Sequence, residues 1–311
     1  MEKTYKDIRY VKLHFSLQIV GNAILPVQKA SMLRGGMGEM LLQSCCIADR
    51  QCETCDFEKE CIVRRIMYSK MEIQPEFMSK GDSVGYVIEC DNYKTGFADG
   101  DILEFRMILI GKTIVYFSQI LDAFYRLGLS GLGKDKAKYR IIKILNSKKE
   151  PIMDGNNIYM DRLKVGTLNE YIEYRLKKMS ETLRSDNDEK INIRFTSPLS
   201  LKYKGEMLDC FNAEAVMKAI ERRLYILCCY EGIEMDKNLI DGEIPEIDII
   251  SCRRVDVPRF SFRKSEKMIL WGLEGEVKIY NASQEMIELL IAGELVHIGK
   301  NTSFGFGKYK L

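Results

Sequence analysis

The sequence predicts an α+β fold made of two successive β-α-β-β-α-β units. Apolar and polar residues alternate over 11–19, which is the pattern of a half-buried strand, and the alternation returns over 191–196. Each of these strands precedes the same series: a helix, two strands, a second helix, a glycine-rich loop and a last strand. This is the order of the ferredoxin-like (RRM-like) unit, so two such domains in tandem are expected.

The elements of the first unit follow from local patterns. In chain order they are a strand at 11–19, a helix at about 28–44 after Pro26, strands at 84–90 and 101–110, a helix at 113–127, the glycine-rich loop 128–133 and a strand after it.

The second unit repeats the plan. Its elements are a strand at 191–196 that stops at Pro198, a helix at 212–230, strands at 259–264 and 274–280, a helix at 283–296, the glycine-rich loop 299–307 and the terminal strand. A polar helical segment, 165–189, is expected to connect the units. The expected domains are therefore 1–164 and 190–311, joined by that connector.

Composition narrows the possible partners. The chain has 311 residues, 46% of them hydrophobic, and a net charge of +2. With so little net charge, a nucleic-acid site must be a local basic patch. No apolar run approaches the ~18 residues of a membrane span, and the charged start MEKTYKDIRY is unlike a signal peptide. A cytoplasmic location is expected.

Cysteines are concentrated in one short stretch. Of ten cysteines, five lie within 45–61, with the spacing Cys45-x6-Cys52-x2-Cys55-x5-Cys61 and a neighbouring Cys46. Four thiolates suit tetrahedral zinc, and a site closed by four thiolates is structural. We expect a zinc knuckle inserted in the first domain. An iron–sulfur cluster or a chance group of reduced cysteines are the alternatives. The other five cysteines are expected in the core.

Several segments in order carry a family resemblance. They are LRGGMGEMLLQSCC (33–46), the cysteines at 45, 52, 55 and 61, LIGKTIVYFSQILDAFYRLGLSGLG (109–133), FTSPLSLKYKG (195–205), ERRLYIL (221–227), PRFSFRKSEKMILWGLEGEV (258–277) and HIGKNTSFGFGKY (297–309). In these segments the chain resembles the CRISPR-associated endoribonucleases that process precursor CRISPR RNA, within the RAMP superfamily. It resembles most the branch with a cysteine cluster in its first domain.

The resemblance implies a function. It implies binding of CRISPR repeat RNA and metal-independent cleavage by the RNA's own 2′-hydroxyl, which leaves a 2′,3′-cyclic phosphate. The product would be a guide RNA for antiviral defence, passed to other CRISPR effector subunits. The family spacing favours Cys45 over Cys46 as the fourth ligand. A catalytically inactive RAMP-type RNA-binding subunit, and a zinc protein that binds nucleic acid outside CRISPR, are the alternatives.

Only two histidines are present as candidates for proton transfer, His14 and His297. His14 lies on the polar face of the first strand, where a hydrogen bond between domains is the alternative role. His297 ends a helix before the glycine loop, where a helix-end residue is the alternative. Many relatives place a catalytic histidine around the first helix. Here Lys29, Ser31 and Arg34 occupy that region, so catalysis by lysine and tyrosine stays open.

Basic residues near glycine loops and along one strand are the predicted RNA contacts. Cations spaced along an extended strand suit a phosphate backbone, although a solvated basic strand is the alternative. Phe304, Phe306 and Tyr309 in the terminal loop are candidates for base stacking. The predicted RNA-binding residues are Lys29, Arg34, Lys134, Arg253, Arg254, Arg259, Arg263, Lys264, Lys300 and Lys308.

Overall fold

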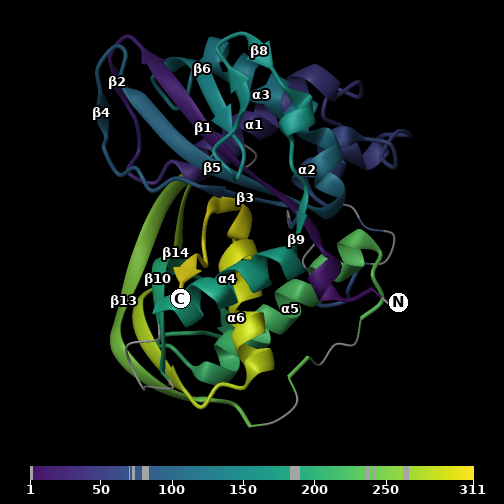
Figure 1. Cartoon of the computed structure of the whole chain (residues 1–311). Helices are drawn as coiled ribbons and strands as arrows, with labels where there is room; N and C mark the ends of the chain where they lie inside the picture. Colours follow the sequence, from purple (N-terminus) through teal and green to yellow (C-terminus); the bar gives the residue numbers. More distant parts are fainter. Residues whose placement is uncertain are drawn as a thin grey trace. The chain divides into compact units, whose positions relative to one another are not determined.

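The computed structural model describes residues 3–69, 71, 74–78, 84–182, 190–235, 239–240, 243–261 and 266–311 (Figure 1). The chain divides into two compact units. The N-terminal unit comprises residues 10–165 and 259–266, and the C-terminal unit comprises 1–9, 166–258 and 267–311. Both are mixed α/β units with antiparallel strand pairs, as the sequence predicts.

The N-terminal unit contains a sheet in the order β3-β5-β1-β6-β7-β8. Its main elements are β1 (Arg9–Val20), α1 (Ala30–Cys45), α2 (Ile62–Met67), β3 (Tyr86–Glu89), β5 (Ile102–Ile110), η3 (Gly111–Tyr116), α3 (Phe117–Ser130), β6 (Lys138–Leu145), β7 (Pro151–Asp154) and β8 (Asn157–Ile158). The alternation predicted for β1 is confirmed. Leu13, Phe15 and Leu17 are buried, whereas His14 and Ser16 between them are half-buried.

Helices α1 and α3 cover the apolar face of this sheet, and their side chains join those of β1 and β5 in one core. The two helices approach closely at Gly36, where an added Cβ would lie 2.5 Å from Leu127 Cδ2. An added Cβ at Gly38 would likewise lie 2.5 Å from Met67 Cε, so packing around α1 explains Gly36 and Gly38. Gly128 plays a similar part in α3, since a Cβ there would lie 2.5 Å from the Tyr139 carbonyl oxygen. Helix α3 ends at Ser130, so Gly128 lies inside the helix and not in the predicted glycine-rich loop.

The C-terminal unit has a second sheet, in the order β13-β14-β10-β15. Its main elements are α4 (Leu168–Thr182), β10 (Lys190–Leu199), α5 (Ala213–Glu231), β13 (Glu246–Ser261), β14 (Glu266–Tyr280), α6 (Gln284–Val296) and β15 (Tyr309–Lys310). Both sheets share one arrangement, in which the first strand of the β-α-β-β-α-β series lies between the third and the fourth. The predicted strand 259–264 is the end of the longer β13, and its residues 262–264 lie outside the described part of the chain. β14 begins at Glu266, in the segment predicted to link the two strands. The sequence did not predict these bounds, because it lacks a clean alternation there.

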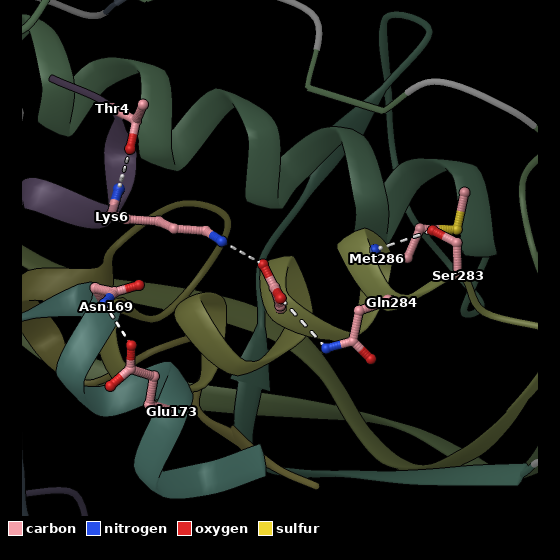
Figure 2. Close-up of polar contacts among 8 residues, drawn as sticks. Thr4, Lys6, Asn169, Glu173, Ser283, Gln284 and Met286 are labelled. Carbon is pink, nitrogen blue, oxygen red and sulfur yellow. Dashed lines mark hydrogen bonds and ion pairs between the residues drawn. The ribbon is translucent and has the colours of Figure 1, made fainter. Parts of the chain in front are cut away.

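The first residues of the chain belong to the C-terminal unit. The Leu168 N–H donates to the Ile8 carbonyl oxygen at 2.9 Å. Lys6 Nζ lies 2.6 Å from Glu288 Oε2 on α6, and Figure 2 shows Lys6 extending from the N-terminal segment toward that helix. Arg9 forms a two-pronged ion pair with Glu231 at the end of α5. These contacts fix the segment before β1 begins.

Helix α4 lies in the segment predicted as a connector, and it packs within the C-terminal unit. Arg175 Nε donates to Glu294 Oε2 at 2.7 Å, and its Nη2 donates to the Leu311 carbonyl at 3.1 Å. The tip of the connector, 183–189, lies outside the described residues. The short pairs β2 (Ala23–Ile24) with β4 (Gly96–Phe97) and β11 (Lys202–Tyr203) with β12 (Glu206–Met207) were not predicted. No helix in the described part of the chain is long and apolar enough to cross a bilayer.

Candidate functional site

His14 lies on the polar face of the first sheet. In the antiparallel register it is opposite Arg106 on β5 and opposite Leu145 on β6. Burial lowers the pKa of His14 below its usual 6.5, and the neighbouring cations Lys12 and Arg106 lower it further. Glu89 and Glu104 act in the opposite direction. The imidazole is therefore neutral at neutral pH, which is the form that can accept a proton.

The guanidinium of Arg106 is fixed beside His14 by two carboxylates. Its Nε donates to Glu89 Oε2 at 2.7 Å, and its Nη2 pairs with Asp91. The Glu89 side chain is only 4% exposed, so it holds Arg106 from within the fold. The sequence reasoning missed Arg106, although the period-two pattern of 101–110 placed its side chain on the polar face.

A row of basic side chains on β6 lies on the same face of the sheet as His14. Lys138 and Arg140 are exposed, and Arg140 is opposite Gln18 on β1. Lys143 is opposite Ser16 after a one-residue shift in the register. With the exposed Lys134 in the preceding loop, these cations give the N-terminal unit a local basic patch, the kind of site that a net charge of +2 requires.

The structure gives His297 a packing role. The residue is fully buried, and its Nδ1 lies 3.0 Å from the Phe306 carbonyl oxygen. Its φ of +57° turns the chain out of α6 into the terminal loop. Proton transfer requires access to the substrate, and a ring enclosed in this way lacks it. The position of His297 therefore does not fit the catalytic role predicted for it.

The terminal glycine loop is packed against β10. The Lys300 N–H donates to the Ser200 carbonyl at 2.7 Å, and the Gly307 N–H donates to the Pro198 carbonyl at 3.0 Å. Phe306 is 3% exposed and Tyr309 is 1% exposed, with the Tyr309 hydroxyl donating to the Leu290 carbonyl. The prediction that these two rings offer faces to bases is wrong, because both rings are in the core.

Two predicted RNA contacts are buried. The Lys29 ammonium donates to the carbonyls of Asn92 and Val27, at 2.7 and 3.4 Å, and burial lowers its pKa. Lys308 is only 7% exposed. Neither side chain is on the surface where a phosphate could reach it. Lys134 and Lys300, in contrast, are exposed as predicted.

The arginines divide into two groups. Arg34 and Arg259 are half-buried near one another in the N-terminal unit, and burial, followed by the charge of Arg34, lowers the pKa of Arg259. Arg253 and Arg254 lie on β13, and each pairs with a carboxylate: Arg253 with Glu274 at 2.8 Å and Arg254 with Asp256 at 3.0 Å. Arg263 and Lys264 lie outside the described residues.

The clustered cysteines line a single hollow. Cys45, Cys46, Cys52, Cys55 and Cys61 all border a cavity of about 250 Å³, together with the apolar Leu42, Phe57 and Tyr68. All five are reduced and half-buried. In the described part of the chain, however, no three metal-ligating side chains converge closely enough to hold an ion. Thiol donors that share one cavity fit a zinc site. In this structure, however, the thiols do not converge on one point as ligands of a bound ion do. The other five cysteines were expected in the core, but only Cys90 and Cys228 are buried, whereas Cys229 and Cys252 are half-buried and Cys210 is exposed.

Two sequence families match this chain. Residues 8–169 match the AF_1859_N family, described as an N-terminal domain. Residues 193–309 match the family described as CRISPR-associated endoribonuclease Cas6. The C-terminal part of the chain thus matches a Cas6 endoribonuclease domain. The two matches cover both expected domains, and no match was found among curated proteins.

Solved Cas6 structures share the fold. The Cas6 (TTHB231) product complex is 13% identical, with a TM-score of 0.54 over 96% of this chain and 98% of that chain. A partial Cas6-RT-Cas1–Cas2 complex is 12% identical, with a TM-score of 0.57 over 97% of this chain. The chain spans 46% of the length of that relative, and 28% of the length of the matching chain in the Cas6-RT-Cas1–Cas2 complex. At such identities the likeness concerns the fold.

Proposed function

We propose that this chain is a Cas6-type endoribonuclease that binds CRISPR repeat RNA and cleaves precursor transcripts into guide RNAs. The observation that carries the proposal is the match of residues 193–309 to the Cas6 endoribonuclease family. The basic patch on the N-terminal unit supplies the local positive surface that RNA binding requires. The shared strand order of the two sheets supports a description as two tandem ferredoxin-like domains.

The cleavage uses the RNA as its own nucleophile. A ring nitrogen of neutral His14 takes the proton of a 2′-hydroxyl, and that oxygen forms a bond to the adjacent phosphorus. The bond from phosphorus to the 5′-oxygen breaks, and the leaving oxygen takes up a proton from water. The products are a 2′,3′-cyclic phosphate and a 5′-hydroxyl. Because the nucleophile belongs to the substrate, this chemistry does not call for a metal ion.

His14 is chosen over the other candidates because of its surroundings. It is only half-buried, its pKa is lowered so that the base form is populated, and Arg106 lies opposite on the next strand. A fixed guanidinium near the reacting group can stabilise the charge that develops on a phosphate. The buried carboxylate of Glu89 keeps Arg106 in place.

Zinc is proposed as a structural element of the N-terminal unit. Cys45, Cys52, Cys55 and Cys61 would hold it after their side chains turn into the common cavity, and four thiolates would leave no open coordination position. In this role the metal would fasten the loop between α1 and α2 and take no part in cleavage. An iron–sulfur cluster would be distinguished by its visible absorption.

A catalytically inactive RNA-binding subunit is the second candidate. The buried positions of His297 and Lys29 favour it. The structure describes both histidines of the chain, and of the two only His14 is partly exposed. If His14 does not act in cleavage, the chain has no histidine left for proton transfer. Such a protein would bind repeat RNA and deliver it to other CRISPR proteins uncut.

Incubation of the full chain with a repeat RNA decides between the two candidates. Cleavage that persists in EDTA and yields a cyclic phosphate supports the endoribonuclease. Tight binding with no cleavage under any metal condition supports the inactive subunit. A cytoplasmic location remains a prediction for both.

A further inference from the structure

The single tryptophan of the chain lies beneath an arginine. Trp271 is on β14, and the guanidinium carbon of Arg254, on the neighbouring strand β13, is 4.2 Å from the centroid of its ring. A cation within about 6 Å of an indole face is attracted by the ring's quadrupole. The Arg254 side chain is nevertheless 58% exposed, so one face of its plane is on the ring and much of the rest faces solvent.

A carboxylate fixes the orientation of this guanidinium. Arg254 Nε donates to Asp256 Oδ1 at 3.0 Å, two residues farther along the same strand. An exposed ion pair alone would order a long side chain weakly. The indole contact and the Asp256 bond together constrain both the plane and its rotation. The result is a flat, oriented surface at a partly exposed position.

Charge compensation changes what these arginines can do. Arg254 is balanced by Asp256, and its neighbour Arg253 is balanced by Glu274, whose side chain is 14% exposed. The sequence predicted that both arginines bind RNA phosphates, yet in the structure each is paired with a carboxylate. Arg254 retains the planar face of its guanidinium. Planar arginine faces are surfaces on which unpaired RNA bases stack.

We propose that Arg254, stacked on Trp271, is a platform for an unpaired base of bound RNA. The base would lie on the outer face of the guanidinium, so that indole, guanidinium and base form one stack. Asp256 acts as a positioning residue, because it sets the angle of the guanidinium plane. The inference rests on the proposed RNA-binding function. It adds a contact to a base, whereas the contacts predicted from the sequence are to the phosphate backbone.

The fluorescence of Trp271 reports binding at this position, because the 311-residue chain has no other tryptophan. The probes are single-stranded oligoadenylate and an abasic oligomer of the same length and charge. We expect oligoadenylate to change the Trp271 fluorescence and to bind more tightly than the abasic oligomer. A stacked base contributes enough that its loss weakens binding about 5- to 150-fold.

The test variant is Arg254→Lys, which keeps the charge and removes the plane. We expect it to lose most of the preference for oligoadenylate while its affinity for the abasic oligomer stays the same. The matched control is Arg126→Lys on α3. Arg126 is similarly exposed and similarly paired, at 2.7 Å from Asp122, but it is not stacked on a tryptophan. It should keep the preference. Trp271→Phe, measured with a labelled oligomer, should keep part of it.

Two results would overturn the platform. One is equal binding of the two oligomers by the wild-type protein, and the other is an unchanged preference in Arg254→Lys. If repeat RNA is bound or cut while the Trp271 signal stays constant, the platform fails and the proposed function stands. If repeat RNA is neither bound nor cut, the proposed function fails as well. Circular dichroism of each variant separates a lost contact from a lost fold.

Discussion

Arg106 lies directly opposite His14 in the antiparallel pairing of β1 with β5. The pairing places a carboxylate-held cation beside the one half-exposed histidine. The cation helps to keep the imidazole neutral, after burial has made the larger contribution. A proton acceptor and a positive charge are thus adjacent, which is what attack by a 2′-hydroxyl on a phosphate needs.

His14→Gln should reduce single-turnover cleavage of repeat RNA by about 10²- to 10⁴-fold, the usual range for a general base. RNA affinity should change little, because an imidazole that is neutral adds no charge to the interface. His297→Gln is the comparison. It should lower the free energy of unfolding by about 1–3 kcal/mol through the lost contact with Phe306, and leave the cleavage rate of the folded fraction intact. Unimpaired cleavage by His14→Gln would remove His14 from the mechanism.

The pH dependence of cleavage should show the lowered pKa of His14. A base works in its unprotonated form, so the rate should rise with pH, with a midpoint below 6.5, and be level at neutrality. Glu89→Gln removes a carboxylate that raises this pKa, and should move the midpoint to lower pH. Glu104 is exposed and raises the pKa of His14 less than Glu89 does, so Glu104→Gln should move the midpoint less. A midpoint above 6.5 in the wild-type protein would contradict the assignment. NMR titration of the His14 imidazole checks the direction of its pKa shift directly.

The packing of the terminal loop predicts that Gly→Ala lowers the free energy of unfolding more at Gly307 than at Gly205. Gly307 has a φ of +69°, and an added Cβ would lie 1.8 Å from the Ile298 carbonyl oxygen. Gly205 has a φ of +92° with no atom within 4 Å of such a Cβ. Gly205→Ala should therefore cost only the conformational term, about 1–2 kcal/mol. Gly307→Ala adds a steric clash and should cost about 3 kcal/mol or more. Equal urea midpoints for the two variants would show that the loop is not packed as described.

Much of the fold could be predicted because its signals are local. The alternation in β1 and the helical patterns of α5 and α6 fixed those elements to within about two residues. The sequence could not show that the polar strand β13 extends over Glu246–Ser261, because its side chains alternate poorly. The element order of each half was likewise readable from the sequence.

The site was harder to predict, because burial is a tertiary property. Nothing near Lys29 or His297 in the sequence shows that their side chains are enclosed by backbone carbonyls from other segments. Arg106 went unnoticed for the same reason, since its importance comes from the strand beside it. The stacking of Arg254 on Trp271 likewise joins residues that are distant in sequence.

The proposed zinc site predicts a difference between adjacent cysteines. The purified protein should contain about one zinc per chain, and Cys45→Ser, Cys52→Ser or Cys55→Ser should lose it. Cys46→Ser should retain the metal, because Cys46 lies outside the proposed ligand set. Its sulfur accepts the Arg50 N–H at 3.3 Å instead. Elemental analysis gives the stoichiometry. Zinc retained by Cys45→Ser and lost by Cys46→Ser would show that the neighbour is the ligand.

The activity proposed for this chain is cleavage of repeat RNA without a metal. This activity is tested by end-group analysis of a repeat RNA after incubation with the 311-residue chain in EDTA. We predict a single cut, a 2′,3′-cyclic phosphate on one fragment and a 5′-hydroxyl on the other. RNA that is bound but stays intact, or is cut only when a divalent metal is added, would contradict the claim.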